Sequence, residues 1–137
     1  MKYEQLIALP IGTVLSAQFT FFQHVGIITG RDHRGLPVVT SNSARKRGVC
    51  IESIEEFSGG RPLRATSRES RLSTVEIVRR AQSAIGWKYD LLRFNCDHFV
   101  EWALGCEPQS QQLQAWAIVG SLVAFGLMVG AKGVPRG

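Results

Sequence analysis

A chain of 137 residues, 45% of them hydrophobic, is long enough to fold around one buried core without disulfide bonds. Its three cysteines form no C-x-x-C pair, which argues against a zinc ribbon or a disulfide framework, so no metal site or cofactor is predicted. The net charge of +5 predicts an anionic partner, either nucleic acid or lipid.

The first segment, residues 1–12, is expected to form a short turn of helix and a loop that ends at Pro10 and Gly12. It has no apolar core long enough for a signal peptide, and free thiols are typical of a reducing compartment. We therefore expect a cytoplasmic domain.

Two stretches rich in β-branched and aromatic residues, 13–19 and 22–29, predict neighbouring strands. In the second stretch His24 shares one face with Gly26 and Ile28, and both faces are mostly apolar. We therefore expect a central strand that leaves His24 buried or half-buried. After a hairpin loop at residues 30–35, further strands are expected at residues 36–41, 48–52 and 62–66.

Two helices are expected in the second half of the chain. The sequence Ser73-Thr-Val-Glu76 has the form of a capping box, and the helix that it starts should end at Gly86. Its apolar stripe is predicted to be Val75, Val78, Ala81 (or Gln82) and Ile85. The second helix is predicted over residues 94–104, where Phe94, Phe99, Val100, Ala103 and Leu104 fall at helical spacing.

Basic residues are concentrated in the middle of the chain, in a run at residues 45–47 and at Arg61, Arg64, Arg68 and Arg71. A solvated loop would explain them equally well. They are not interleaved with aromatic residues and glycines as in RNA-binding sequences. We therefore expect an anionic lipid surface as the partner and no nucleic acid.

The C-terminal part, residues 109–137, differs in composition from the domain expected over residues 1–108. After a polar linker, residues 115–131 carry no charge. A span of the bilayer core needs roughly 20 residues, with a range of about 17–25. We predict a hydrophobic helix that associates the chain with a phospholipid membrane, and the alternative is a buried helix of the soluble core.

The same apolar run contains Gly126 and Gly130 in the spacing that lets two helices approach closely, which predicts a weak dimer. Trp116 at one margin of the run and Lys132 at the other resemble interfacial anchors.

Cys96 is the strongest candidate for a catalytic residue. It falls in the first turn of the predicted helix, where backbone N–H groups and the helix dipole favour an anion such as a thiolate. A thiolate needs a base, and His24 on its strand is the expected one. His98 lies on another face of the helix and is expected to be a structural hydrogen bonder, and His33 lies in a polar loop.

The sequence His-Val-Gly-Ile-Ile-Thr-Gly at residues 24–30, then Tyr89, then Asn-Cys-Asp-His-Phe-Val at residues 95–100, resembles the lecithin retinol acyltransferase family. That group includes the H-Ras-like suppressor phospholipase/acyltransferases and belongs to the circularly permuted, NlpC-like enzymes of papain fold. The resemblance spans roughly residues 9–131. It implies an α+β fold with a small antiparallel sheet packed on helices, and it maps Cys96 to the nucleophile and His24 to the base.

The resemblance also implies supporting residues. Asn95 keeps its place in the motif, and Tyr89 matches a tyrosine at the same distance before the cysteine. Such enzymes usually carry a second histidine on the strand after the hairpin, but residues 37–43 contain none. Ser41 or Asn42 falls nearest to the expected place, and an Asn side chain can orient an imidazole.

From these residues we predict an acyl hydrolase or acyltransferase that acts on membrane phospholipid through an acyl-enzyme at Cys96, with acyl donor and acceptor lipids as partners. Two alternatives stay open. One is a cysteine peptidase or amidase of NlpC type, and the other is a non-catalytic interaction module that retains the motif.

Overall fold

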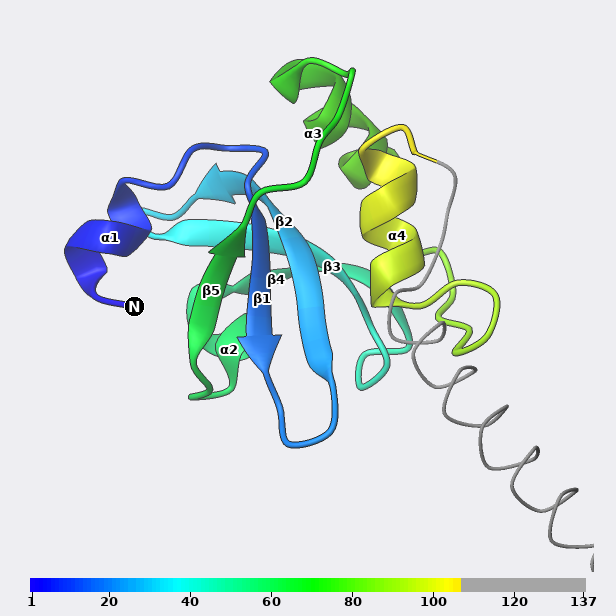
Figure 1. Cartoon of the computed structure of the whole chain (residues 1–137), viewed down its shortest axis with the longest axis horizontal. Coiled ribbons are helices and arrows are strands. Elements are labelled where there is room, and N and C mark those ends of the chain that lie inside the picture. The colour runs from blue at the N-terminus through cyan, green and yellow to red at the C-terminus, as the bar shows by residue number, and fades with distance from the viewer. Residues whose placement is uncertain (107–137) are drawn as a thin grey trace, which may run out of the picture.

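Five strands form one antiparallel sheet in the order β4-β3-β2-β1-β5 in the computed structural model, which describes residues 1–106 (Figure 1). The strands are β1 (Val14–Gln18), β2 (Gln23–Arg31), β3 (Pro37–Ser43), β4 (Gly48–Ser53) and β5 (Leu63–Thr66). All five coincide with segments predicted as strands, and β2 is central as expected. The fold is therefore α+β, with a small antiparallel sheet packed on helices.

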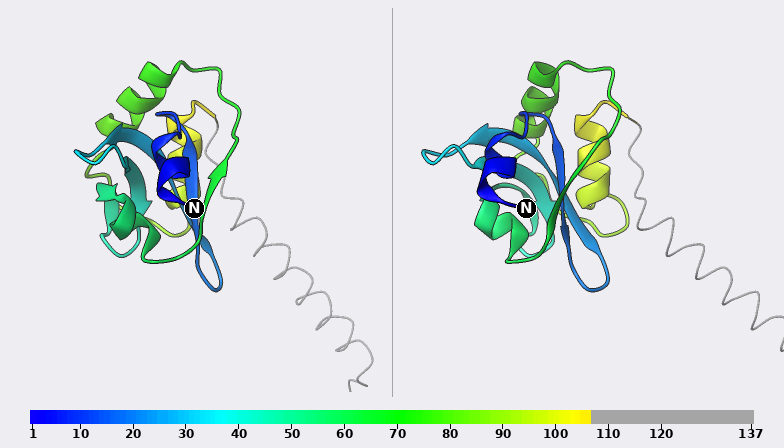
Figure 2. Two further views of the ribbon diagram at one scale, coloured as in Figure 1. Left: turned by 90° about the vertical axis from the view of Figure 1, so that its left-hand side faces the viewer. Right: turned by 60° about the vertical axis from the view of Figure 1, so that its left-hand side comes forward.

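The helices cover both faces of the sheet, as the two views in Figure 2 show. They are α1 (Tyr3–Ile7), α2 (Ile54–Ser58), α3 (Thr74–Ser83) and α4 (Cys96–Ala103). Helices α3 and α4 enclose one hydrophobic core against the sheet. Helices α1 and α2 enclose a second core on the opposite face.

The alternation of side chains along β2 explains why this strand is apolar on both faces. Val25 and Ile27 point into the core beneath α3 and α4. Ile28 points into the core beneath α1 and α2. All three are at most 1% exposed, so β2 contributes to both cores at once.

Helix α3 begins after Ser73, whose hydroxyl accepts a hydrogen bond from the N–H of Glu76, as the capping box predicts. The predicted apolar stripe is correct at Ala81, which is buried, and wrong at Val75 and Ile85, which are 66% and 43% exposed. Ile77 and Ala84 complete the buried face. The two alanines present little bulk toward α4, so the face with the smaller side chains is the one that packs.

Helix α2 was not predicted from the sequence. Ser53 caps its first turn by accepting a hydrogen bond from the N–H of Glu56, and Gly59 ends it in the left-handed conformation at φ 55°. Its Phe57 is 1% exposed in the second core. Five residues are too few to show a helical period, which is why only the capping residues carry a signal.

The predictions for the C-terminal part lie outside the described residues. These are the linker and hydrophobic helix of residues 109–137, the membrane association through residues 115–131, and the dimer through Gly126 and Gly130. Within residues 1–106, none of the helices has the length and apolar character required to cross a membrane.

Candidate active site

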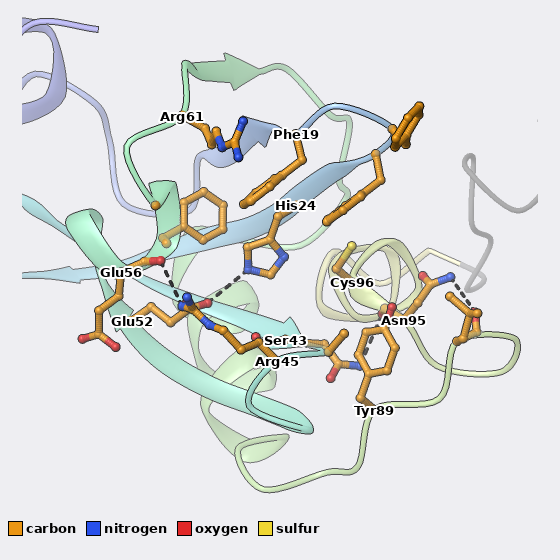
Figure 3. Close-up of a pocket in the computed structure, with 17 residues that line it drawn as sticks. Phe19, His24, Ser43, Arg45, Glu52, Glu56, Arg61, Tyr89, Asn95 and Cys96 are labelled. Carbon is orange, nitrogen blue, oxygen red and sulfur yellow. Dashed lines mark hydrogen bonds and ion pairs between the residues drawn. The ribbon is translucent and has the colours of Figure 1, made fainter.

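A cavity of about 660 Å³ opens at the end of the sheet where β2 begins, β3 ends and α4 begins (Figure 3). Cys96 and His24 both line it. Asn42, Glu52, Tyr89 and Asn95 contribute further polar side chains, and Phe19, Phe21, Phe22, Phe57 and Leu91 contribute apolar ones. Its volume falls in the range of about 300–1,000 Å³ that is typical of small-molecule sites.

Cys96 is the first residue of α4, and it is 6% exposed. The side chain of Asn95 caps the helix by accepting a hydrogen bond from the N–H of His98 at 3.1 Å. In return, Nδ1 of His98 accepts a hydrogen bond from the N–H of Asn95 at 3.0 Å. The helix therefore begins two residues later than the predicted residue 94, Cys96 lies in its first turn as expected, and the structural role of His98 is confirmed.

The thiol of Cys96 lies against the start of β2. Its Sγ is 3.7 Å from the carbonyl oxygen of Gln23, the residue before His24. The His24 ring packs on the other face of the sheet, where its centre is 4.8 Å from that of Phe57. Because His24 and Cys96 stand at the same end of the sheet, their side chains still line one cavity.

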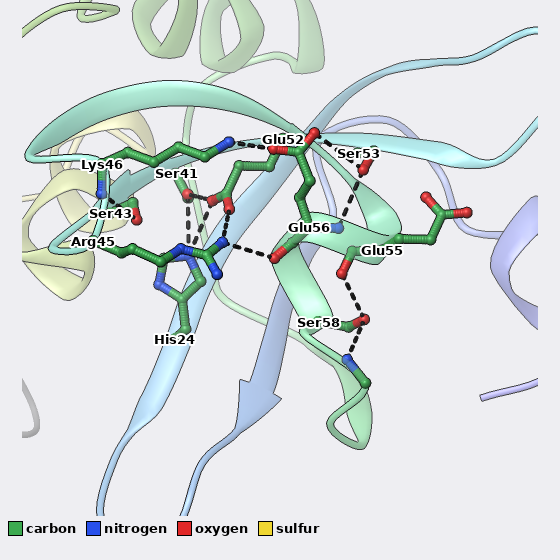
Figure 4. Close-up of polar contacts among 11 residues, drawn as sticks. His24, Ser41, Ser43, Arg45, Lys46, Glu52, Ser53, Glu55, Glu56 and Ser58 are labelled. Carbon is green, nitrogen blue, oxygen red and sulfur yellow. Dashed lines mark hydrogen bonds and ion pairs between the residues drawn. The ribbon is translucent and has the colours of Figure 1, made fainter.

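The imidazole of His24 is held by two polar side chains, one from β3 and one from β4 (Figure 4). Its Nε2 is 3.1 Å from Oε1 of Glu52 on β4 and 3.2 Å from Oγ of Ser41 on β3. The hydroxyl of Ser41 also donates a hydrogen bond to Oε1 of Glu52. Of the two residues that the sequence offered in place of a second histidine, Ser41 is therefore the one that reaches His24.

Asn42, the other alternative, makes its hydrogen bonds elsewhere and none to His24. Successive side chains of a strand point to opposite faces, and Ser41 already occupies the face of His24. Asn42 lies on the face of α4, where its Nδ2 donates to the carbonyl oxygens of Phe94 at 2.8 Å and Asn95 at 3.4 Å. It therefore holds the segment that leads into Cys96.

Glu52 is the residue that the sequence analysis missed. It is 1% exposed and lies 28 residues from His24 in the chain. Across the sheet it pairs with Val39, which pairs with Ile28, and Ile28 shares a face with His24. The only local signal is an acidic residue in the strand Gly48–Ser53, which is otherwise uncharged.

The Glu52 carboxyl is ionised in this setting. Burial by itself raises its pKa, but the hydrogen bonds from His24 and Ser41 outweigh burial and hold the pKa below the ordinary value. An ionised carboxylate only accepts hydrogen bonds, so the proton between the two groups belongs to Nε2 of His24. In a neutral imidazole held in this way, the other ring nitrogen, Nδ1, carries the lone pair.

Tyr89 also lines the cavity. Burial, with smaller contributions from the nearby Cys96 and Asp97, raises the pKa of its hydroxyl to about 12. The hydroxyl therefore stays protonated at neutral pH and has a proton to donate.

The other two cysteines lie outside the cavity, and one of the predicted basic residues is ion-paired within the domain. Cys50 and Cys106 do not line the cavity, and burial is the main reason that the pKa of each thiol is raised. Arg68, part of the predicted basic surface, is instead paired with Asp97 at 3.3 Å and Glu101 at 2.7 Å. Within residues 1–106, no group of acidic, histidine and cysteine side chains is arranged to hold a metal ion.

Comparison with known proteins gives one family. The family model described as lecithin retinol acyltransferase matches residues 8–107. A search of the curated proteins found no match. The matched range contains the five strands described above, the histidine and the cysteine that line the cavity, and the whole of α4.

Proposed function

The chain belongs to the lecithin retinol acyltransferase family, and from this premise we propose that it is a cysteine-dependent acyl hydrolase or acyltransferase acting on membrane phospholipid. Acyl transfer and acyl hydrolysis are the activities associated with the family. The observation that carries the proposal is the cavity that Cys96 and His24 line together, with Glu52 and Ser41 hydrogen-bonded to the imidazole.

In the first step His24 acts as the base. Because Glu52 keeps the proton on Nε2, Nδ1 is the nitrogen that takes the proton of the Cys96 thiol. The imidazolium that forms is stabilised by the buried carboxylate on its other side. Glu52 thus serves as the orienting third member of the site, although it lies on β4 and not on β3, the strand after the hairpin where the resemblance led us to expect a second histidine.

In the second step the Cys96 sulfur attacks the carbonyl carbon of an acyl ester. The negative charge that develops on the carbonyl oxygen is met by backbone N–H groups in the first turn of α4 and by the positive end of its dipole. The Tyr89 hydroxyl, a donor that lines the same cavity, adds a second source of stabilisation.

The tetrahedral intermediate collapses when the carbon–oxygen bond to the leaving alcohol breaks, and His24 returns its proton to that alcohol. The product is a thioester on Cys96. Attack by water then releases a fatty acid, and attack by an amine or alcohol transfers the acyl group to that acceptor. In either case His24 accepts the proton of the attacking group, and the thiol is restored.

The composition of the cavity suits a phospholipid. Its phenylalanines and Leu91 offer an apolar wall for an acyl chain, and Arg45 and Arg61 offer positive charge for a phosphate group. Such a substrate matches the family better than a peptide, which is the substrate of the rival cysteine peptidase.

The experiment that tests the proposal is intact-mass measurement of the full chain after mixing with phosphatidylcholine vesicles. We expect an added acyl mass that hydroxylamine removes, because hydroxylamine cleaves thioesters. Cys96→Ala should abolish the adduct. Cys50→Ala, which removes a thiol outside the cavity, should retain it.

Two results would contradict the proposal. An adduct that survives in Cys96→Ala places the chemistry elsewhere. A Cys96 thiol that forms no adduct and reacts with iodoacetamide no faster than Cys50 and Cys106 indicates a non-catalytic interaction module.

A further inference from the structure

Four large apolar side chains are exposed at the mouth of the cavity. Phe21 and Phe22 are 82% and 52% exposed, and Leu91 and Leu92 are 62% and 71% exposed. The phenylalanines belong to the turn between β1 and β2, and the leucines belong to the loop before α4. Phe21, Phe22 and Leu91 line the same cavity, so two distant segments of the chain contribute to one apolar rim.

The turn between β1 and β2 is held in an ordered conformation. The N–H of Phe19 donates to the carbonyl oxygen of Phe22 at 2.9 Å, which closes the hairpin. The rings of Phe19 and Phe22 stack with centres 4.8 Å apart, and the guanidinium of Arg61 lies 5.3 Å from the centre of the Phe19 ring. Phe21 is therefore exposed although the turn that carries it is held by a backbone hydrogen bond and ring contacts.

The loop before α4 is equally well held. Asp90 and Phe94 exchange two backbone hydrogen bonds of 2.8 Å. The carboxylate of Asp90 accepts the N–H groups of Leu92 and Arg93, each at 3.0 Å. This polar scaffold turns the two leucines outward. Exposed apolar side chains on ordered segments around a cavity mark a binding surface.

The charges around the rim are complementary to an anionic surface. Arg45 and Arg61 line the cavity, and Arg93 follows Leu92; all three are exposed. The acidic side chains at the same place are already engaged: Glu52 with His24 and, at 3.8 Å, with the exposed Arg45, Glu56 with Lys46, and Asp90 with the backbone of its own loop. Aromatic and aliphatic side chains bordered by arginines are suited to the interface of a bilayer with anionic headgroups.

We propose that this rim, formed by Phe21, Phe22, Leu91 and Leu92 with Arg45, Arg61 and Arg93, docks the domain on the surface of an anionic phospholipid bilayer. The inference rests on the proposed function, because it names the surface through which that site meets its substrate. The apolar side chains enter the headgroup region, and the arginines contact lipid phosphates. The mouth of the cavity then faces the bilayer, so an acyl ester reaches Cys96 without crossing water.

Hydrogen–deuterium exchange of the full chain tests the docking surface directly. With vesicles of phosphatidylcholine and phosphatidylserine, we expect slower exchange in the peptides that contain Phe21 and Leu92. The turn at residues 32–36, which lies at the other end of β2, should be unchanged. Vesicles of phosphatidylcholine alone should protect the rim less, because the arginines then lack an anionic partner.

Two variants distinguish binding of the rim to the vesicles from binding of another part of the chain to them. Leu92 does not line the cavity, so Leu92→Ser removes an exposed apolar side chain and leaves the cavity walls in place. We expect it to lose the protection of the rim. Val75→Ser is the matched control, because Val75 is 66% exposed on α3, away from the cavity, and its removal should leave the protection unchanged.

The outcomes distinguish this inference from the proposed function. Unchanged exchange at the rim when the chain sediments with vesicles, or no binding to vesicles at all, overturns the docking surface. Equal loss of protection in Leu92→Ser and Val75→Ser overturns it as well. An acyl adduct on Cys96 without rim protection refutes docking alone, whereas rim protection without an adduct refutes catalysis alone.

Discussion

Glu52 brings a carboxylate to a position where the strand after the hairpin offers only a hydroxyl. The Ser41 hydroxyl reaches Nε2 of His24, but a hydroxyl can donate or accept, and it is the carboxylate of Glu52 that accepts the hydrogen bond of the Ser41 hydroxyl and leaves Ser41 to accept from the ring. An ionised carboxylate decides which ring nitrogen is protonated, because it only accepts. In the proposed mechanism this single residue therefore sets the tautomer of the base and stabilises its protonated form.

Replacing Glu52 with Gln should lower the reactivity of Cys96. The amide keeps the shape of the side chain but loses the negative charge that stabilises the imidazolium. We expect the rate of alkylation of Cys96 by iodoacetamide to fall roughly 100-fold at neutral pH and below, the lower end of the usual size of acid–base contributions, because His24 itself is retained. Rates measured between about pH 5 and pH 8, the range over which imidazole titrates, would show it.

Glu55→Gln is the matched control for that measurement. Glu55 is also a glutamate near the end of β4, but it is exposed, pairs with Arg34 and does not line the cavity. Its loss should leave the rate of Cys96 alkylation unchanged. Equal rates for the native chain and Glu52→Gln would show that the carboxylate has no part in activating the thiol.

At the scale of the elements, His24 is positioned by the close packing of β2 against β3 and α2. Gly26 lies opposite Ser41 in the sheet. A Cβ at this position would come within 2.6 Å of Cγ1 of Val39 and 3.0 Å of the ring of Phe57. The glycine thus allows β2, β3 and α2 to pack closely where the partners of His24 are held.

Gly26→Ala should therefore destabilise the domain. Strain from the added methyl group is expected to lower the free energy of unfolding by about 1–3 kcal/mol. It should also displace Ser41 and reduce the rate of Cys96 acylation. Urea unfolding followed by circular dichroism measures the first effect, and intact-mass kinetics measure the second.

Gly30→Ala in the same strand is the control, since nothing lies within 4 Å of a Cβ there and its φ is not positive. Its effect on the free energy of unfolding should stay within about 0.5 kcal/mol. A Gly26→Ala variant as stable as Gly30→Ala would contradict the packing argument.

At the scale of the whole molecule, one sheet separates two cores and the cavity opens at one end of it. The base projects from the face that α2 covers, and the thiol belongs to the face that α4 covers. The arrangement depends on both cores being formed. Its polar centre, Glu52 with its two hydrogen-bonded neighbours, is buried within that fold and so links the stability of the domain to pH.

The sign of this linkage follows from the lowered pKa of Glu52. Burial alone would raise it, but the hydrogen bonds from His24 and Ser41 hold it below the ordinary value of 4.5. A carboxylate with a depressed pKa stabilises the fold fully above its unfolded pKa, and that contribution is lost as the pH falls through the folded value. Below pH 4.5 the native chain should therefore lose stability faster than Glu52→Gln.

Thermal unfolding of the two proteins from pH 6 down to about pH 3 measures this difference, since the group titrates in that range. The difference in stability between native chain and variant should shrink as the pH falls below the ordinary pKa. If the stability of the native chain and that of Glu52→Gln change in parallel with pH across this range, the ionised Glu52 carboxylate does not stabilise the folded domain.

Local patterns in the sequence were enough to predict the elements that carry the site. Alternation over a few residues predicted that β2 is central and that His24 is buried or half-buried, and helical spacing with polar residues near its start predicted that Cys96 lies in the first turn of α4. The stripe of α3 was misjudged because two sets of small and apolar residues share its surface, and only packing against α4 chose between them.

What the sequence by itself determined is thus the type and order of the elements other than the short helix α2, because capping, alternation and helical spacing act between near neighbours in the chain. Only the tertiary structure decided which side chains surround His24. The lateral order β4-β3-β2 and its register bring Glu52 to the imidazole and turn Asn42 to the other face. A contact between strands depends on the pairing of the whole sheet, and no short stretch of sequence encodes that pairing.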